Sequence, residues 1–428
     1  MRISMFTNTY LPHVGGVARS VSTYEDVLRR RGHDIAIVAP EFPGAEESTD
    51  LVLRVPAIQN FNGSDFSVRI PQPWLISDRM EQFHPDLIHS HHPFSLGDSA
   101  LRTAYERRLP LVFTHHTMYE QYSHYVPLDS DALKRVAIQL ATEYCNLCSH
   151  VIAPSESIEE LLRHRGVSVP ITTIPTGIDL SFFGSGDAAR FRQSCHIHHD
   201  AVVVGHVGRL ADEKNLQFLA TAVGLFLENN PEGVFLVVGD GPAKISMQDI
   251  LTQHGVHDRV VFAGVRSGQD LADAYAAIDV FAFSSQSETQ GMVVAEALAA
   301  ACPVVALEGP GIREVVNDSN GRMLSAHASV REFAAVLTEL TEDTNRLWRI
   351  GELARESVHA YGLECCADKL TNLYESLIAE SGSWGGRELD PWDQFQGRVE
   401  AEWKLLTEKA SALVAAVVDT DATKAMLV

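Results

Sequence analysis

Short apolar runs alternate with longer stretches of helical periodicity along most of the chain. In the first half, the apolar runs predict strands at residues 3–6, 34–39, 87–89, 111–114, 151–153 and 172–174, with helices at 17–31, 73–83, 95–108, 131–149 and 158–165. A second series predicts strands at 201–207, 234–238, 260–263, 280–283 and 304–306, with helices at 215–229, 243–254, 268–276, 292–301 and 330–341. Because strands that alternate with helices form parallel βαβ units, the two series predict an α/β protein with two Rossmann-like domains.

Three glycines, Gly177, Gly184 and Gly186, loosen the chain where the second series begins. We therefore expect an N-terminal domain at residues 1–178, a C-terminal domain at 179–364 and a helical extension at 365–428. The extension contains a predicted helix at 365–379, a linker at 381–386 that is rich in glycine and serine, and a further predicted helix at 391–418.

This last predicted helix carries an apolar stripe. Large apolar residues recur along it at roughly helical spacing: Trp392, Phe395, Val399, Trp403 and Leu406. In one interpretation the helix packs this stripe on the body of the protein, and in another it dimerises or docks on a membrane. The acidic residues of the helix, such as Glu400, Glu402 and Glu408, favour packing.

The composition argues against several classes of function. The 428 residues are 45% hydrophobic and 21% charged, and 34 basic against 56 acidic residues give a net charge of −22. Nucleic acid is not an expected partner, because neutralising phosphates requires basic patches. An anionic membrane surface is also disfavoured, unless a local patch overrides the field of the whole molecule. Without an apolar run long enough to span a bilayer and without a recognisable signal peptide, the sequence predicts a cytoplasmic protein.

The stretch SQSETQGMVVAE at residues 285–296 places two carboxylates, Glu288 and Glu296, eight residues apart. An apolar strand precedes it and a helical run follows it. In parallel sheets, ligands bind outside the carboxyl ends of strands. The backbone N–H groups at a helix N-terminus also suit an anion. The stretch therefore predicts a site for a polyhydroxyl group beside a phosphate.

A second strand end carries two cations. Gly208 and Arg209 follow the predicted strand at 201–207, and Lys214 comes five residues later. Glycine lets a diphosphate approach the backbone, and two cations can neutralise it. An enzyme that releases a nucleoside diphosphate requires this stabilisation of its leaving group. The alternative is a solvated turn with surface charges, but the carboxylate pair downstream favours the functional interpretation.

Two strand ends in the first half carry histidines. His89, His91 and His92 lie at the end of one predicted strand, and His115 and His116 follow another. Three histidines at this spacing also suit a metal ion. Because no carboxylate or cysteine nearby completes such a site, we do not expect a metal here.

The spacing of Glu288 and Glu296, together with the Gly-Arg-x-x-x-x-Lys stretch at 208–214, resembles the retaining glycosyltransferases of family 4. The resemblance covers roughly residues 1–380. It implies the GT-B fold, in which two Rossmann-like domains face each other across a cleft and a C-terminal helix crosses back to the first domain. It also implies transfer of a hexose from a nucleotide diphosphosugar, with retention at the anomeric carbon and without a metal or another cofactor.

The resemblance implies roles in catalysis for four residues. His116 would hydrogen-bond the donor sugar near the reaction centre, and Arg209 and Lys214 would stabilise the departing diphosphate. Glu288 would accept hydrogen bonds from the sugar ring rather than act as a nucleophile. The expected reaction is a substitution on one face of the sugar, in which the leaving phosphate takes the proton of the acceptor.

A larger set of residues is expected to bind the donor. Its members are Gly15, Gly16, Gly208, Val265, Arg266, Gln290, Gly291, Met292 and Glu296. By the resemblance, Glu296 accepts hydrogen bonds from the ribose hydroxyls, Val265 and Arg266 lie beside the base, and the remaining residues meet phosphate or sugar oxygens.

The histidine pairs and the tyrosines that follow them resemble the diacylglycerol glucosyltransferase branch of the family. This implies UDP-glucose as the donor, a diacylglycerol acceptor and a weak peripheral contact with the inner face of the membrane. The expected acceptor-binding residues are His91, His92, Tyr119 and Tyr122. The alternative is a soluble acceptor, such as a sugar, a sugar phosphate, a polyol or a polysaccharide, because the net charge of −22 opposes lipid binding. A nucleotide-sugar-binding protein without turnover and a phosphorylase are further alternatives, and the oligomeric state stays open.

Overall fold

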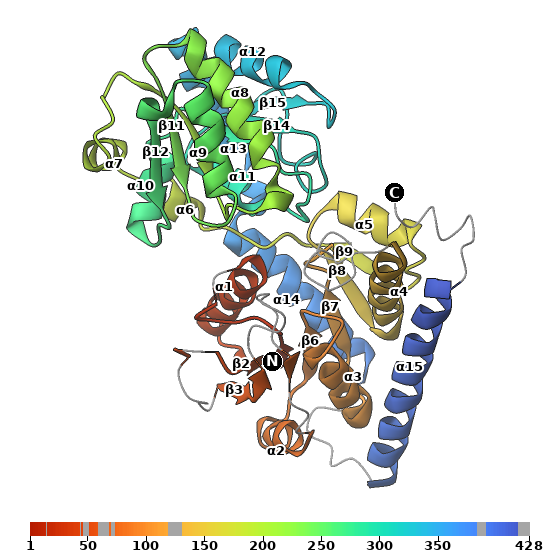
Figure 1. The fold of residues 1–428 in the computed structure, drawn as a ribbon. Coiled ribbons are helices and arrows are strands. Elements are labelled where there is room, and N and C mark those ends of the chain that lie inside the picture. Colours follow the sequence, from red (N-terminus) through yellow and green to blue (C-terminus); the bar gives the residue numbers. More distant parts are fainter. Residues whose placement is uncertain are drawn as a thin grey trace. The chain divides into compact units, whose positions relative to one another are not determined.

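The computed structural model describes residues 1–13, 15–42, 44–45, 51–58, 68–69, 73–118, 131–382 and 391–417. The chain divides into two compact units (Figure 1). The first unit comprises Met1–Thr176 and Cys366–Val428, and the second comprises Gly177–Cys365. Tyr119, Tyr122 and most of the segment 59–72 lie outside the described residues.

A parallel sheet forms the centre of the first unit. Within the described residues it has seven strands in the order β3-β2-β1-β6-β7-β8-β9. Their bounds are Arg2–Phe6 (β1), Asp34–Pro40 (β2), Val52–Val55 (β3), Leu87–Ser90 (β6), Leu111–Thr114 (β7), His150–Ala153 (β8) and Ile171–Thr173 (β9). The strand order reverses between β1 and β6, which is the topological switch point where ligands bind in open α/β sheets.

Helices complete the first unit, together with a short antiparallel hairpin of β4 (Ala57–Ile58) and β5 (Val68–Arg69). The helices are Gly16–Arg30 (α1), Pro73–Phe83 (α2), Leu96–Arg107 (α3), Asp131–Leu147 (α4), Glu156–His164 (α5), Leu363–Glu380 (α14) and Pro391–Val417 (α15). The strands β6, β7 and β8 are buried along their whole length, as expected for parallel strands that helices cover on both faces. α14 begins in the second unit, and its residues from Cys366 onward belong to the first.

The second unit, which the structure describes throughout, contains a six-stranded parallel sheet in the order β12-β11-β10-β13-β14-β15. Its strands are Val202–Val207 (β10), Gly233–Val238 (β11), Val260–Gly264 (β12), Val280–Phe283 (β13), Val304–Leu307 (β14) and Gly321–Leu324 (β15). Here the order reverses between β10 and β13, so the loops after these two strands meet at the switch point.

The second unit contains the α-helices Leu180–Phe183 (α6), Ala188–Ser194 (α7), Leu216–Asn229 (α8), Lys244–Gln253 (α9), Gln269–Ala276 (α10), Met292–Ala299 (α11), Val330–Thr341 (α12) and Thr344–Ser357 (α13). Three 3₁₀ turns accompany them, at Asp212–Lys214 (η3), His257–Arg259 (η4) and His359–Tyr361 (η5). Polar residues begin several of the helices. At α12, Ser329 and Glu332 form a reciprocal capping box, and at α13 the Asp343 carboxylate accepts hydrogen bonds from two backbone N–H groups.

The predicted α/β class with two parallel sheets is confirmed. Seven of the described strands and α-helices were not predicted: β3, β15 and α13, and the short elements β4, β5, α6 and α7. β3 contains Arg54, a residue that disrupts an apolar run. The guanidinium is buried and donates hydrogen bonds to the backbone oxygens of Pro40 (3.2 Å) and Leu11 (2.6 Å). These hydrogen bonds compensate for the burial of the charge, and they come from segments that are distant in the sequence.

The prediction that α15 packs its apolar stripe on the body is wrong. α15 packs against α3 and α4 (Figure 1). However, the residues of the stripe, from Trp392 to Leu406, are exposed, and the opposite face of the helix is buried. Among the described residues, none of the helices combines the length and the apolar character that crossing a bilayer requires.

Candidate active site

Glycines bring the loops after β10 and β11 into direct backbone contact in the second unit. Gly208 follows β10, and Gly239 and Gly241 follow β11, all three with φ values between +136° and +155°. A Cβ atom on Gly239 would lie 1.9 Å from the carbonyl oxygen of Gly208, and one on Gly241 would lie 2.3 Å from that of Leu210. Only glycine fits at these two positions. The resulting surface is backbone without side chains, which a phosphate can approach closely.

Lys214 and Glu288 form an ion pair at the switch point of the second unit. Nζ of Lys214, the last residue of η3, lies 2.6 Å from Oε1 of Glu288, which follows β13. The pKa of the Glu288 carboxyl lies below its usual value. Burial alone would raise this pKa, but the charge of Lys214 and hydrogen bonds from Lys214 and Ser285 lower it by more. Glu288 is therefore ionised at neutral pH and can only accept hydrogen bonds.

Crossed hydrogen bonds hold the two loops of this ion pair together. The hydroxyl of Ser284 donates to the backbone oxygens of Lys214 (3.1 Å) or Asn215 (3.0 Å), and the Asn215 amide donates to the backbone oxygen of Ser284 (3.3 Å). The hydroxyl of Ser287 donates to the backbone oxygen of Glu213 (3.0 Å). We did not anticipate these residues, although the three serines between β13 and Glu288 were a signal.

Arg209 and His206 lie beside this pair in the chain. The Arg209 guanidinium forms an ion pair with Glu213 in η3. His206, within β10, is buried, and burial with the charge of Lys214 lowers its pKa to about 4, despite a hydrogen bond to the Ala282 backbone oxygen. Its ring is thus neutral at pH 7. Arg209 and Lys214 both follow β10, as the sequence predicts, and each is paired with a carboxylate. Their contact with a diphosphate stays a prediction.

The loop after β14 encloses the N-terminus of α11. Gly291, with φ +70°, precedes α11, and a Cβ atom there would lie 2.4 Å from Cδ1 of Ile312. A Cβ atom on Gly311 would lie 2.6 Å from the backbone nitrogen of Gln290, whose side chain is buried. Met292 is the first residue of α11. The backbone N–H groups of this helix start are therefore held in a tightly packed turn, which fits the expected anion site.

The remaining donor-binding predictions of the second unit lie in different surroundings. Glu296 is fully buried in α11, and its Oε2 accepts a hydrogen bond from the hydroxyl of Tyr275 at 2.7 Å. A contact of Glu296 with ribose stays a prediction, because the carboxylate would first have to become accessible. Val265 is exposed, and the Arg266 guanidinium lies 5.9 Å from the centre of the Phe191 ring. Their place beside a base also stays a prediction.

In the first unit, His91 bonds to the predicted catalytic histidine. The strands β6 and β7 pair in parallel, so the residues after their carboxyl ends are neighbours. Nδ1 of His91 lies 2.9 Å from Nε2 of His116, and the two rings stack. Burial, together with the neighbouring histidines, holds the pKa of both rings well below the usual value. Both rings are therefore neutral at pH 7, and one nitrogen of the pair donates to the other.

His89 ties this pair to α14. Its Nε2 lies 2.7 Å from the hydroxyl of Thr114, its Nδ1 lies 2.6 Å from the hydroxyl of Tyr374, and its ring is 4.0 Å from that of His91. Burial lowers the pKa of His89 to about 3. A neutral ring with both nitrogens bonded keeps one orientation, which also restricts His91.

His92 is buried and hydrogen-bonded to the loop after β1. Its Nδ1 accepts a hydrogen bond from the backbone N–H of Asn8 at 3.0 Å, and the Asn8 amide donates to the backbone oxygen of Phe94 at 3.0 Å. His91 and His92 are both buried, so their contact with an acceptor stays a prediction. Gly15 and Gly16 lie at the start of α1, where a Cβ atom on Gly16 would meet open space.

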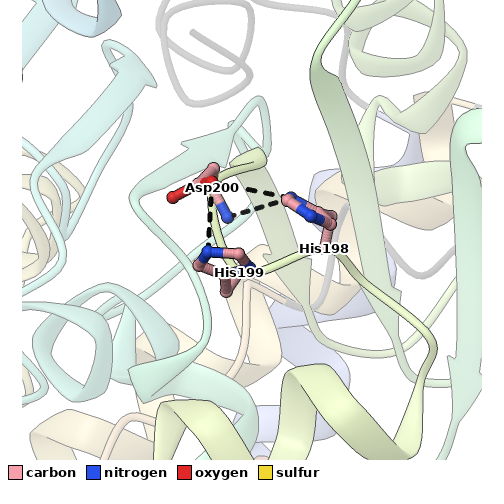
Figure 2. A group of neighbouring side chains, drawn as sticks. All are labelled: His198, His199 and Asp200. Carbon is pink, nitrogen blue, oxygen red and sulfur yellow. Dashed lines mark hydrogen bonds and ion pairs between the residues drawn. The ribbon is translucent and has the colours of Figure 1, made fainter.

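Within the described ranges, one group of side chains brings three potential metal ligands together (Figure 2). It consists of His198, His199 and Asp200, which precede β10. All three are exposed, and Nε2 of His199 lies 3.1 Å from a carboxylate oxygen of Asp200. Consecutive exposed polar residues are typical of a solvated turn, and we assign no function to them.

Comparison with known families covers most of the chain. Residues 14–182 match the model of glycosyltransferase family 4, and residues 187–357 match the model of glycosyl transferases group 1. These two matches divide near residue 180, close to where the first unit gives way to the second.

Several individual proteins are similar over most of their length. The alpha-monoglucosyldiacylglycerol synthase of Streptococcus pneumoniae is 30% identical over 326 residues, which are 74% of this chain and 74% of that protein. A GDP-mannose-dependent alpha-mannosyltransferase of Corynebacterium glutamicum is 26% identical over 390 residues, which are 89% of this chain and 90% of that protein. The solved sucrose-phosphate synthase of Thermosynechococcus elongatus has a TM-score of 0.71 at 20% identity, covering 89% of this chain and 99% of the other. At this identity the last likeness concerns the fold, and it confirms the predicted GT-B architecture.

Proposed function

The chain belongs to glycosyltransferase family 4, and we propose that it transfers glucose from UDP-glucose to the hydroxyl group of diacylglycerol, with retention at the anomeric carbon. The observation that carries the proposal is the Lys214–Glu288 pair at the switch point of the second unit. In this proposal the Lys214 ammonium stabilises the departing diphosphate, and the ionised carboxylate beside it binds hydroxyl groups of the sugar.

The residues of the second unit suit the departure of a nucleoside diphosphate. In the proposed reaction, the bond between the anomeric carbon and the diphosphate oxygen breaks, and Arg209 and Lys214 neutralise the charge that develops on this oxygen. The acceptor oxygen bonds to the same face of the sugar, and its proton passes to the leaving phosphate. Glu288 is already ionised and bonded to Lys214, so in this proposal it orients sugar hydroxyls and does not attack the sugar.

His116 is proposed to hydrogen-bond the donor sugar as a neutral ring. Its low pKa excludes a role as a resident cation at pH 7. A neutral imidazole can both donate and accept one hydrogen bond, and His91 already bonds to Nε2. No metal ion takes part in the proposed reaction, since the two cations of the chain supply the charge.

The relatives and the charge of the chain bear on which donor and which acceptor the protein uses. The relative from S. pneumoniae is named for glucose and diacylglycerol, whereas the one from C. glutamicum is named for GDP-mannose. The histidine pairs and the higher identity favour the first. A soluble acceptor is the second candidate, and the net charge of −22 favours it because anionic lipid surfaces repel such a protein.

Release of nucleoside diphosphate in EDTA tests this proposal. The donors to compare are UDP-glucose, UDP-galactose, UDP-N-acetylglucosamine and GDP-mannose, each with and without vesicles that contain diacylglycerol. Release that requires UDP-glucose and vesicles supports the proposal, and an α-linkage in the product supports retention. Release that ignores vesicles but responds to a soluble sugar or polyol supports the second candidate, and a requirement for metal contradicts the proposed mechanism.

His91 gives a prediction about the orientation of His116. His91→Phe preserves the stacked ring but removes the nitrogen that bonds to Nε2 of His116. We expect kcat to fall about 10- to 100-fold with little change in KM for the donor, because His116 loses its fixed tautomer. Nitrogen NMR of His116 should show a changed tautomer population in this variant.

The control is His91→Gln, which offers an amide to His116 and should recover part of kcat. A purely structural role for His91 would lower stability but leave the His116 tautomer as it is in the unsubstituted protein. An unchanged tautomer in His91→Phe would therefore contradict the positioning role.

A further inference from the structure

The buried face of α15 is rich in small residues, and most of its large apolar residues are exposed. The buried face consists of Gly397, Ala401, Leu405, Glu408 and Ala412, and it packs on α3 and α4 (Figure 1). A Cβ atom on Gly397 would lie 2.2 Å from the backbone oxygen of Tyr105, so the helix lies directly on the backbone of α3. Small residues thus allow the close approach. Ala401 and Leu405 join the core of the first unit, whereas most of the large apolar residues of α15 lie on the opposite face.

The opposite face of α15, which we call the outer stripe, is apolar and exposed. Its five members have exposed fractions between 54% and 72%: Trp392 62%, Phe395 54%, Val399 54%, Trp403 72% and Leu406 65%. The rings of Trp392 and Phe395 stack on each other at 5.6 Å. Monomeric proteins rarely leave a contiguous apolar face of this kind, so the outer stripe indicates an interaction surface.

The charged residues of α15 flank the outer stripe and bond to α3. Three of these ion pairs join Arg102 to Glu402 (2.5 Å), Arg108 to Asp393 (2.7 Å) and Arg398 to Glu106 (2.5 Å). A fourth joins Lys409 to Asp98 (3.0 Å), and Lys404 pairs with Glu400 within the helix (3.0 Å). These bonds hold the helix in one orientation and engage its described basic side chains, while the outer stripe itself carries no charge.

We propose that two copies of this chain associate through the outer stripe, with α15 of one copy packed against α15 of the other. The members of the stripe follow one another at intervals of three, four, four and three residues, which is the eleven-residue repeat of some paired helices rather than the heptad. A homodimer with twofold symmetry uses the same patch on both subunits, which a single uniform stripe satisfies. The exposed parts of three aromatic and two aliphatic side chains amount to roughly 500 Å² per copy. Two copies would bury about 1,000 Å², the lower limit for a specific interface.

Charge favours a second copy over a lipid surface as the occupant. Helices that lie on membranes carry lysine and arginine beside their apolar face, where these contact anionic headgroups. Here the basic side chains are engaged in ion pairs, and Glu400 and Glu402 lie on the helix beside the stripe. The net charge of −22 opposes an anionic surface further. Two copies of this acidic chain also repel each other. Salt screens this repulsion beyond about 8 Å at physiological ionic strength, so association should strengthen as salt is added.

Sedimentation of the full-length chain over a range of concentrations and salt tests this proposal. We expect a dimer whose dissociation constant rises at least 100-fold in Trp403→Glu, because the charge would enter the centre of the seam. The matched control is Trp348→Glu, which changes a tryptophan with an exposed fraction of 68% on α13 and should leave the dimer intact. Circular dichroism should show that both variants remain folded, since both side chains are exposed.

A monomer at all concentrations, or a dimer that persists in Trp403→Glu, would overturn the proposal. So would binding of a monomer to phosphatidylcholine vesicles that Trp403→Glu abolishes, which would assign the stripe to a bilayer instead. The proposal does not depend on the sugar donor or the acceptor, and its outcome is independent of the activity assays.

Discussion

Lys214→Ala should lower kcat/KM for glycosyl transfer about 100- to 1000-fold, the largest loss that we expect from a single substitution in the second unit. The substitution removes a cation that lies 2.6 Å from Glu288 and at the end of the strand where a departing diphosphate is proposed to lie. The developing negative charge on the leaving oxygen would lose a preorganised partner. Because this partner matters most in the transition state, the loss should fall mainly on kcat.

The neighbouring carboxylate makes a sharper test possible. Glu288→Gln keeps a hydrogen-bond acceptor for the sugar but removes the charge that Lys214 balances. We expect a loss of about tenfold to 100-fold for this variant. The double variant should lose less than the product of the two single losses, because Lys214 and Glu288 act on each other.

A second ion pair of the same unit provides the control. Arg346 and Glu339 form an ion pair at 3.1 Å on the surface, and both side chains are exposed. Arg346→Ala removes a cation of the second unit without touching the proposed site, so kcat/KM should not change. Turnover in Lys214→Ala at the rate of the unsubstituted protein would refute the site assignment.

Mild acid should destabilise the first unit strongly, because five histidines whose pKa values lie well below the usual value must stay neutral in the folded state. Burial lowers the pKa of His89, His92 and His115 to about 3, and that of His91 and His116 lies well below its usual value. In the unfolded chain each of these rings takes up a proton near pH 6.5. Below that pH the unfolded state binds more protons than the folded state, so the free energy of unfolding falls as the pH falls.

The size of this effect follows from the number of rings. Each histidine contributes a loss of about 1.4 kcal/mol between neutral pH and pH 5.5. Glu408 partly offsets this loss. Burial raises the pKa of its carboxyl to about 8, so the folded state binds one proton here that the unfolded state lacks above about pH 5. The net loss is about 4 kcal/mol, which is a large part of the stability of a typical domain. Thermal unfolding followed by circular dichroism between pH 7.5 and pH 5.5 should show a steep fall in Tm.

One substitution identifies the histidines as the cause. His92→Asn replaces a ring that accepts a hydrogen bond from the Asn8 backbone N–H with an amide whose oxygen can accept the same bond. The slope of the free energy of unfolding against pH should decrease by about one proton in this variant. A Tm that stays constant from pH 7.5 to pH 5.5 would contradict the prediction.

Local sequence pattern predicted those elements whose signals lie within the element itself. The bounds of α2, β7, β13 and α12 agree with the prediction, because an apolar run or a helical period with a clear start is complete in each of them. β15 and α13 lacked such signals. β15, with the sequence GRML, finds its apolar environment only by pairing with β14, and α13 follows α12 after a short turn capped by Asp343.

Residue types and their spacing were sufficient to predict which residues belong to the candidate site. Glu288 and Lys214 lie 74 residues apart, yet both were predicted from the strand ends that they follow, because parallel strands place their carboxyl ends at one edge. The sequence did not reveal that the two form an ion pair, nor that Ser284, Ser287 and Asn215 tie their loops together. Such bonds depend on which loops become neighbours.

The sequence by itself determined the α/β class, the family and the positions of the charged and polar residues at strand ends, because periodicity and spacing are local properties of a chain. Only the tertiary structure decided which of these groups are buried and what each one contacts. It buried His91 and bonded it to His116, and it enclosed Glu296 against Tyr275. It also turned the small residues of α15 inward, because only they allow the close approach to α3 that Gly397 makes. Burial and partner choice arise from contacts between distant segments, which no local pattern encodes.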